Sequence, residues 1–105
     1  MLVPVGFTDR SGAKLRPAVV VSSDRYSRDT PDIVIASITG NLNALAHPGD
    51  HRIVDWGGAG LLRPSLAQTK LATIEASIVV RKLGQLTPSD LGALDRGLRE
   101  ALALG

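Results

Sequence analysis

The chain has 105 residues, 44% of them hydrophobic and 21% charged, and it contains no cysteine. This length and composition predict a single globular domain, residues 1–105, and exclude disordered and collagen-like proteins. The lack of cysteine excludes disulfide frameworks, thiolate nucleophiles, zinc ribbons and iron–sulfur clusters. A formal net charge of +2 is compatible with a nucleic-acid partner but is not strong evidence for one.

Membrane segments are not predicted either. The apolar run Ala18–Val21 is four residues long, far short of the ~20 residues that span a bilayer. The N-terminus has no basic region followed by an apolar stretch, so no secretory signal is expected. We therefore predict a cytoplasmic protein.

The first part of the chain indicates short strands separated by turns. Residues 2–7 are apolar and extended in character, and polar residues 7–12 predict a turn and loop after them. Residues 16–22 are β-branched and almost wholly apolar, which is typical of a central strand buried on both faces. Residues 24–32 are polar and predict a loop or short turn, followed by another strand at 33–38.

The middle of the chain contains a long break. Residues 39–50 carry Gly, Asn and Pro and predict mainly a loop, which is a candidate recognition loop. A short strand is expected at 51–55. The glycine-dense segment 57–60 predicts a turn, because it lacks the Lys-Ser/Thr tail and the following helix of a phosphate-binding loop. Two further strands are expected at 65–74 and 78–86.

The last segment has helical periodicity. Thr87 supplies a capping hydroxyl, Pro88 suits the first helical position, and Asp90 lies in the first turn. Leucines then recur at three- and four-residue spacing and form one apolar stripe. We predict an amphipathic helix over 87–104, packed on the sheet or on a partner. The stripe consists of Leu91, Leu94, Leu98 and Leu102.

Several strands and one terminal helix, without regular alternation of the two, predict a mainly β fold of the α+β class. The expected architecture is a small, curved, largely antiparallel sheet or barrel with the helix against it.

The two histidines, His47 and His51, do not predict a metal site. Pro48 and Gly49 lie between them, so the pair cannot share a helical face as zinc ligands do. Histidines of this kind are typically solvated. The carboxylates are scattered singly and give no support for an acid–base pair. Most cations are interpreted as surface charges without a role, including Arg25, Arg28, Arg63, Arg81 and Lys82.

Arg16 and Thr39 stand apart because each lies at the end of a predicted buried strand. Arg16 is where a loop enters the strand at 16–22, and Thr39 is where the strand at 33–38 runs out into the long loop. Antiparallel pairing of these strands would bring Arg16 and Thr39 together. A guanidinium provides forked, permanently charged donors to phosphate oxygens, and a threonine hydroxyl can hydrogen-bond a phosphate or a 2′-hydroxyl.

Six stretches of the chain occur in the order and spacing of one bacterial family: Phe7–Asp9, Lys14–Ser22, Ile35–Thr39, Ala59–Leu62, Gln68–Ile74 and Leu83–Pro88. The most specific part is the Arg-Pro-Ala-Val-Val string that begins at Arg16, followed by the strand that ends at Thr39. On these residues the chain resembles the MazF/PemK family of toxin ribonucleases over most of its length.

The resemblance implies an SH3-like antiparallel barrel with a C-terminal α-helix and a homodimer. It also implies sequence-selective, metal-independent cleavage of single-stranded RNA without a cofactor, and a cognate antitoxin peptide as a partner. The family's catalytic arginine falls on Arg16 and its catalytic threonine on Thr39. RNA contacts are expected from Lys14, Ser37, Gln68 and Lys70.

Elementary chemistry agrees with these roles. RNA carries its own nucleophile, the 2′-hydroxyl, so an enzyme needs only to align it with the adjacent phosphorus, stabilise the dianionic transition state and help protons move. Arg16 suits the stabilising role, whereas a general base is not identified by the sequence.

The chain departs from the family pattern at three points, one of which is Gly6, where a proline is common in the subgroup. It begins Met1-Leu2-Val3-Pro4, where members usually have a Gly-Asp pair ahead of the first strand, and this departure predicts a shortened first strand. Ser11 stands where some members carry a loop glutamate, so that residue's role is not transferred.

Two other functions are weighed against the nuclease. A related barrel fold, as in CcdB-like proteins, acts as a toxin by binding DNA gyrase and performs no chemistry. A catalytically inactive family member would retain only antitoxin binding or regulation. The combination of Arg16 with Thr39 favours the nuclease.

Overall fold

The computed structural model describes residues 2–9, 12–43, 47–79 and 81–105, with side chains from residue 15 onward. One antiparallel sheet has the strand order β1-β2-β3-β5-β4. Its strands are β1 (Leu2–Asp9), β2 (Gly12–Val20), β3 (Asp32–Thr39), β4 (His51–Arg52) and β5 (Leu66–Glu75). The helices are α1 (Asp24–Asp29), the 3-10 turn η1 (Ala76–Ile78) and α2 (Pro88–Ala101).

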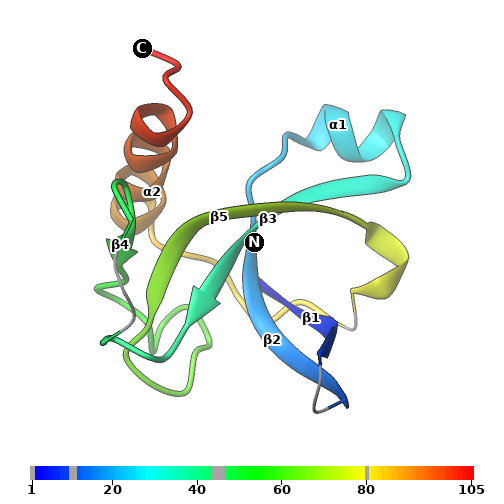
Figure 1. Ribbon diagram of the computed structural model, residues 1–105, viewed down its shortest axis with the longest axis horizontal. Coiled ribbons are helices and arrows are strands. Elements are labelled where there is room, and N and C mark those ends of the chain that lie inside the picture. The colour runs from blue at the N-terminus through cyan, green and yellow to red at the C-terminus, as the bar shows by residue number, and fades with distance from the viewer. Residues whose placement is uncertain (1, 10–11, 44–46, 80) are drawn as a thin grey trace.

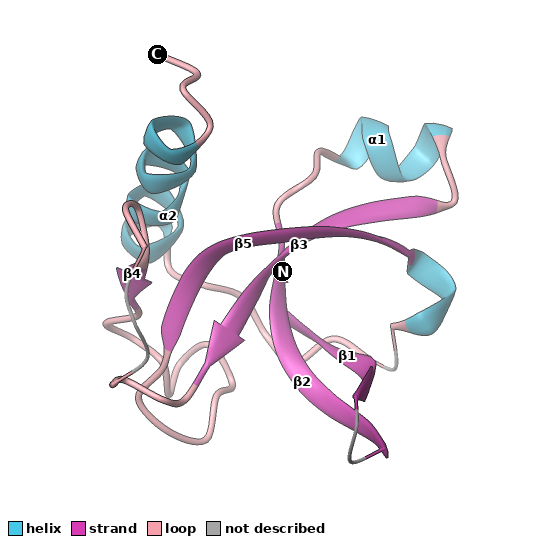
Figure 2. Ribbon diagram, in the orientation of Figure 1, coloured by secondary structure: helices cyan, strands magenta, loops and turns pink. Residues whose placement is uncertain are grey.

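The sheet is strongly curved (Figure 1), with β5 arching across the molecule and the β1–β2 hairpin bending away from it. The predicted mainly β chain with an antiparallel sheet and a C-terminal helix is confirmed. Among the described strands no ladder joins the two edge strands, β1 and β4. The sheet is therefore open, whereas a closed barrel was one of the two expected forms. Helix α2 stands beside β4 and the beginning of β5 (Figure 2).

The core is formed mainly by the middle of the sheet. Ala18 and Val19, which are successive residues of β2, are both fully buried, so β2 is covered on both faces as its apolar run predicted. Buried residues of β3, β5, α2 and the loops complete the main cluster: Ala36, Ile38, Ile53, Ala59, Leu61, Ala67, Leu86 and Leu94. A second cluster contains Ala18, Ile33 and Ile35.

The strands differ in length from the sequence expectation. β1 runs through Asp9 and β2 starts at Gly12, so most of the turn predicted at 7–12 is paired strand. β4 is only two residues long, although the N–H of Ile53 still donates to the carbonyl of Ser65, one step further along the same register. The ladder between β3 and β5 is irregular between Ala36 and Ile38.

Two segments contradict the sequence interpretation. The loop predicted at 24–32 contains α1, which begins at an N-cap where Ser23 accepts a hydrogen bond from Tyr26 N–H at 3.1 Å. The strand predicted at 78–86 is absent among the described residues. η1 closes with a hydrogen bond from Val79 N–H to the carbonyl of Ala76, and the described part of 78–86 contains only isolated bridges, at Val79 and Gly84.

Helix α2 begins as predicted and is held by its neighbours. Thr87 caps it by accepting from Asp90 N–H at 3.1 Å, and Pro88 occupies the first turn. Gly97 lies directly against the backbone of Gly49. The contact is so close that a Cβ on either glycine would overlap the carbonyl of the other. Of the apolar stripe, Leu94 is fully buried but Leu91 and Leu102 are about half exposed. No helix in the described ranges has the length and apolar character needed to cross a membrane.

Candidate active site

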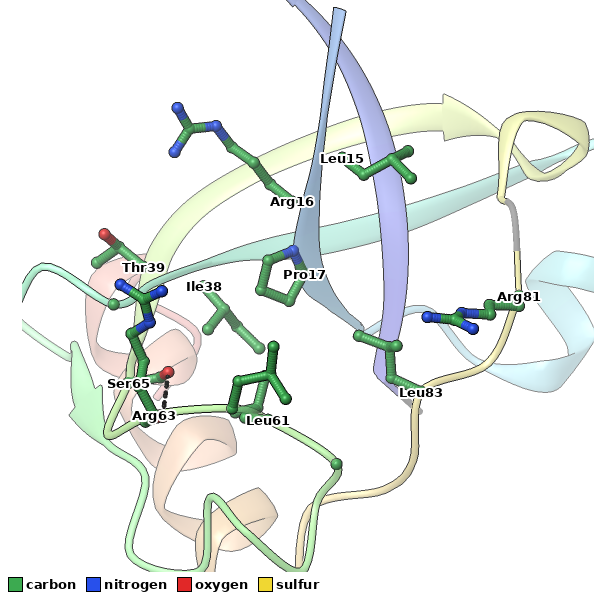
Figure 3. Close-up of a pocket in the computed structure, with 13 residues that line it drawn as sticks. Leu15, Arg16, Pro17, Ile38, Thr39, Leu61, Arg63, Ser65, Arg81 and Leu83 are labelled. Atoms are coloured by element: carbon green, nitrogen blue, oxygen red, sulfur yellow. Dashed lines mark hydrogen bonds between the residues drawn. The ribbon is translucent and has the colours of Figure 1, made fainter.

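A cavity of about 540 Å³ opens where β2 and β3 diverge from the loop that precedes β5. This volume is in the range of small-ligand pockets, about 300–1,000 Å³. Its floor is apolar and includes Pro17, Ile38, Leu61 and Leu83, whereas its polar lining comes from widely separated parts of the sequence (Figure 3). The polar lining residues are Arg16, Thr39, Arg63, Ser65 and Arg81.

Arg16 and Thr39 meet at this cavity because of the strand register. The β2–β3 ladder pairs Val20 with Ile35 and Ala18 with Ser37, and Arg16 and Thr39 follow two residues beyond its last pair, at the same end of the two strands. Both residues line the cavity. The exposed side chain of Arg16 extends from β2 above the cavity in Figure 3, and Thr39 lies at the end of β3.

The hydroxyl of Thr39 is oriented by the backbone that follows it. Its Oγ1 accepts a hydrogen bond from Asn41 N–H at 3.1 Å, and Asn41 in turn accepts from Asn43 N–H at 3.1 Å. A hydroxyl that accepts one such bond can still donate its own proton. Thr39 can therefore donate to a phosphate oxygen or accept from a 2′-hydroxyl.

Arg63 and Arg81 belong to the cavity although the sequence interpretation treated both as surface charges without a role. Arg63 is in the loop between β4 and β5, and Arg81 follows η1. The loop is shaped by the buried Ser65, whose hydroxyl donates to the carbonyl of Arg63 at 2.9 Å. No local sequence signal distinguishes these two arginines, because only the fold brings them to the cavity that Arg16 also lines.

The lining is strongly cationic. Among the residues whose side chains the structure describes, it contains three arginines and no aspartate or glutamate. Within the described part of the chain, none of the three guanidinium groups has a carboxylate within 4 Å, whereas Arg25 and Arg99 on the helices are each paired with an aspartate. A cavity of this composition favours an anion, and forked guanidinium donors fit phosphate oxygens.

Three other predicted RNA contacts, Ser37, Gln68 and Lys70, lie outside the cavity. Ser37 is half-buried in β3, Gln68 is buried in β5, and Lys70 is exposed in β5, all near the irregular part of the β3–β5 ladder. Lys14 belongs to β2, but its side chain lies outside the described residues, as does Ser11 altogether. The structure therefore places Arg16 and Thr39 on the cavity, but not Ser37, Gln68 or Lys70.

The two histidines have structural partners. His47 is half exposed and its Nδ1 lies 3.8 Å from the carboxylate of Asp50. His51 is mostly buried, and its Nε2 lies 2.7 Å from a carboxylate oxygen of Asp90. The expectation that both histidines are solvated is thus wrong for His51, because β4 places it against the first turn of α2.

Buried carboxylates hold the loop after β3 and the start of α2. Burial alone would raise the pKa of Asp90, but hydrogen bonds from Val54 N–H, His51 and Asp55 N–H lower that pKa to about 2. Burial likewise opposes ionisation of Asp50, yet the backbone N–H groups of His47 and Thr69 lower its pKa. Both carboxylates lie outside the cavity lining and serve the fold.

Comparison with known proteins gives one consistent family. Residues 2–102 match the family of PemK-like, MazF-like toxins of type II toxin–antitoxin systems. The endoribonuclease MazF6 of Mycobacterium tuberculosis is 30% identical over 93 residues, which cover 88% of this chain and 82% of that protein. Endoribonuclease MazF2 of Mycobacterium bovis matches with the same values.

Solved structures share the fold. A MazE–MazF structure from Deinococcus radiodurans superimposes with a TM-score of 0.78 at 18% identity, covering 99% of this chain and 93% of that chain. A mycobacterial endoribonuclease in complex with its cognate antitoxin gives a TM-score of 0.73 at 21% identity, covering 98% and 93%. With the family match over nearly the whole length, this chain belongs to the PemK-like, MazF-like toxins of type II toxin–antitoxin systems.

Proposed function

We propose that this protein is an endoribonuclease that cleaves single-stranded RNA sequence-selectively at the Arg16–Thr39 cavity, without a metal ion. The observation that carries the proposal is the placement of Arg16 and Thr39 in one cavity, whose lining among the described side chains holds two further arginines and no carboxylate. The relatives named as endoribonucleases support the same activity.

In the proposed reaction the 2′-oxygen of one nucleotide attacks the adjacent phosphorus. The new O2′–P bond forms as the P–O5′ bond breaks, which leaves a 2′,3′-cyclic phosphate on one fragment. The proton lost from the 2′-hydroxyl is balanced by protonation of the departing 5′-oxygen. Because cleavage needs no external nucleophile, the protein contributes alignment and charge stabilisation.

Arg16 and Thr39 have different tasks in this reaction. The permanently charged guanidinium of Arg16 stabilises the negative charge that accumulates on the phosphoryl oxygens. The Thr39 hydroxyl, held by Asn41 N–H, positions a phosphoryl oxygen or the 2′-hydroxyl. We assign the selectivity for particular RNA sequences to the loops that border the cavity, including residues 40–43.

Incubation of the purified protein with a long single-stranded RNA in the presence of a chelator tests this function. We expect discrete fragments that end in a cyclic phosphate and begin with a 5′-hydroxyl. Arg16→Ala protein should leave the RNA intact under the same conditions. Absence of fragments from the unaltered protein would refute the nuclease and favour a toxin that acts by binding, such as a gyrase inhibitor, or an inactive family member.

A cognate antitoxin peptide is the second proposed partner. An acidic and apolar peptide would match both the arginines and the apolar floor of the cavity. The structural relative solved with its antitoxin supports such a partner. We expect a neutralising antitoxin to compete with RNA, so an antitoxin that blocks cleavage while RNA affinity stays unchanged would overturn this competition.

We further propose that the protein is a homodimer. A groove borders α2, α1 and β5, and its apolar rim is exposed in the single chain. Burial of this rim against a second copy would remove apolar surface from water. Sedimentation at micromolar concentration should show a species of twice 11.0 kDa, and a lone 11.0 kDa species would refute the dimer. The rim includes Tyr26, Leu71, Leu102 and Leu104.

A further inference from the structure

Arg63 lies across the backbone immediately after Thr39. A Cβ built at Gly40 would be 2.6 Å from Cδ and 3.3 Å from Cγ of Arg63, so the missing side chain at position 40 makes room for the arginine stem. In Figure 3 the Thr39 side chain lies between the guanidinium groups of Arg16 and Arg63. The stem of Arg63 is thus packed while its charged group borders the cavity.

Among the described side chains, the guanidinium of Arg63 has no carboxylate partner that would explain its position. Within the described residues no carboxylate lies within 4 Å of it, in contrast to the ion pairs Arg25–Asp29 and Arg99–Asp95. Arginine stems commonly cover apolar surface while the guanidinium stays in water. A packed stem at the rim of a cationic cavity therefore presents several N–H donors to an incoming anion.

We propose that Arg63 is a substrate-binding residue that holds the RNA phosphate next to the scissile phosphate, and that Gly40 is required for its placement. This inference rests on the proposed ribonuclease function. Arg16 and Arg63 reach the cavity from different elements on the two sides of Thr39. An RNA strand carries one charge per nucleotide, so a second guanidinium beyond the reacting group matches the neighbouring phosphate.

The first experiment measures binding separately from cleavage. The probe is the mapped RNA site with the reacting 2′-hydroxyl replaced by hydrogen, so that binding is measured without reaction. Arg63→Gln should weaken binding about tenfold. It should also lower the slope of log affinity against log salt by about 0.7, the value for one lost contact to a single strand. Arg63→Lys should keep most of the salt slope because it keeps the charge.

Arg28→Gln is the matched control. Arg28 is an exposed arginine of α1 that does not line the cavity. Its replacement removes the same charge from the protein. An equal loss of RNA affinity in Arg28→Gln and Arg63→Gln would show that the loss depends only on net charge, and this result would overturn the proposal. Thermal unfolding of both variants should match that of the unaltered protein, since both side chains are exposed.

A second experiment locates the contact on the RNA. Neutral methylphosphonate groups replace, one at a time, the phosphates on either side of the cleavage site. One replacement should weaken binding to the unaltered protein about tenfold and have little effect on Arg63→Gln, as a double-mutant cycle requires of two groups in contact. If every replacement acts equally on both proteins, Arg63 does not bind a neighbouring phosphate.

Gly40→Ala tests the packing directly, because the new methyl group would displace the Arg63 stem while the charge remains. Because the displaced arginine keeps its charge, we expect an affinity loss smaller than that of Arg63→Gln, with most of the salt slope retained. Gly57→Ala is the control, since a Cβ at Gly57 meets nothing within 4 Å. Unchanged binding by Gly40→Ala would refute the role of Gly40.

The inference and the proposed function fail differently. If the unaltered protein cleaves RNA but Arg63→Gln keeps the full salt slope, only the role of Arg63 is refuted. If the unaltered protein neither cleaves nor binds single-stranded RNA, the proposed function fails and the inference fails with it.

Discussion

The Nε2–H of His51 donates to a carboxylate oxygen of Asp90 at 2.7 Å and joins β4 to the first turn of α2 across 39 positions of sequence. The same carboxylate accepts from Val54 N–H at 2.9 Å and from Asp55 N–H at 3.0 Å. Asp90 was expected only as an acidic residue near a helix N-terminus. In the structure it is the buried anchor between the helix and the loop after β4.

This anchor predicts a stability change in acid. The pKa of Asp90 is lowered to about 2 from an ordinary 3.8, so its contribution is complete above about pH 4 and is lost as the pH falls through 2. The shift corresponds to on the order of 2 kcal/mol. Urea unfolding of Asp90→Asn should show a loss of at least about 2 kcal/mol at pH 7, with the two proteins converging near pH 2. A constant difference across this range would contradict the prediction.

The close contact between α2 and the loop before β4 predicts opposite effects of two alanine substitutions in the same helix. Gly97→Ala would force a methyl group into the backbone of Gly49 and should destabilise the protein by about 1–3 kcal/mol. At Gly92 a Cβ would meet only Arg96 Nη1 at 3.5 Å, so Gly92→Ala should stabilise by up to about 1 kcal/mol through helix propensity. Denaturant unfolding measures both, and equal effects would exclude the proposed packing.

Arg16→Ala should lower the single-turnover cleavage rate by at least about 10²-fold, the effect typical of losing one preorganised donor. Stability should change by less than about 1 kcal/mol, because Arg16 is exposed at the edge of the buried part of β2. Arg28→Ala serves as the control with an unchanged rate. A near-normal rate for Arg16→Ala would mean that another residue stabilises the transition state.

Thr39 should depend on its hydroxyl. Thr39→Ala is expected to reduce cleavage, and Thr39→Ser should retain more activity because it keeps the oxygen that accepts from Asn41 N–H. If Arg16 and Thr39 serve one phosphate, the double alanine variant should lose less than the product of the two single effects. Single-turnover rates of the four variants on one defined RNA check this. Equal rates for Thr39→Ser and Thr39→Ala would remove the hydroxyl from the mechanism.

The local sequence pattern predicted a strand or helix correctly where the residues of that element alone determine its structure. The apolar β-branched run before Ser22 predicted a strand buried on both faces, and Thr87 with Pro88 predicted the start of α2. The expectation that Arg16 and Thr39 lie near each other also came from sequence, because antiparallel neighbours place opposite strand ends together, and both residues line one cavity. α1 was missed although Ser23 and Asp24 carry a capping signal, since its exposed helix has no apolar periodicity.

Thus the sequence by itself determined the fold class, the terminal helix and the two candidate catalytic residues, Arg16 and Thr39. Hydrophobic periodicity, helix capping and the positions of strand ends can be recognised from residues that are close together in the chain. Only the tertiary structure decided which isolated charges matter. Arg63 and Arg81 carry no local signal and become part of one cavity because the loops that hold them converge there. His51 and Asp90 likewise acquire their roles by burial against each other, since hydrogen bonding between distant residues depends on packing rather than on spacing along the chain.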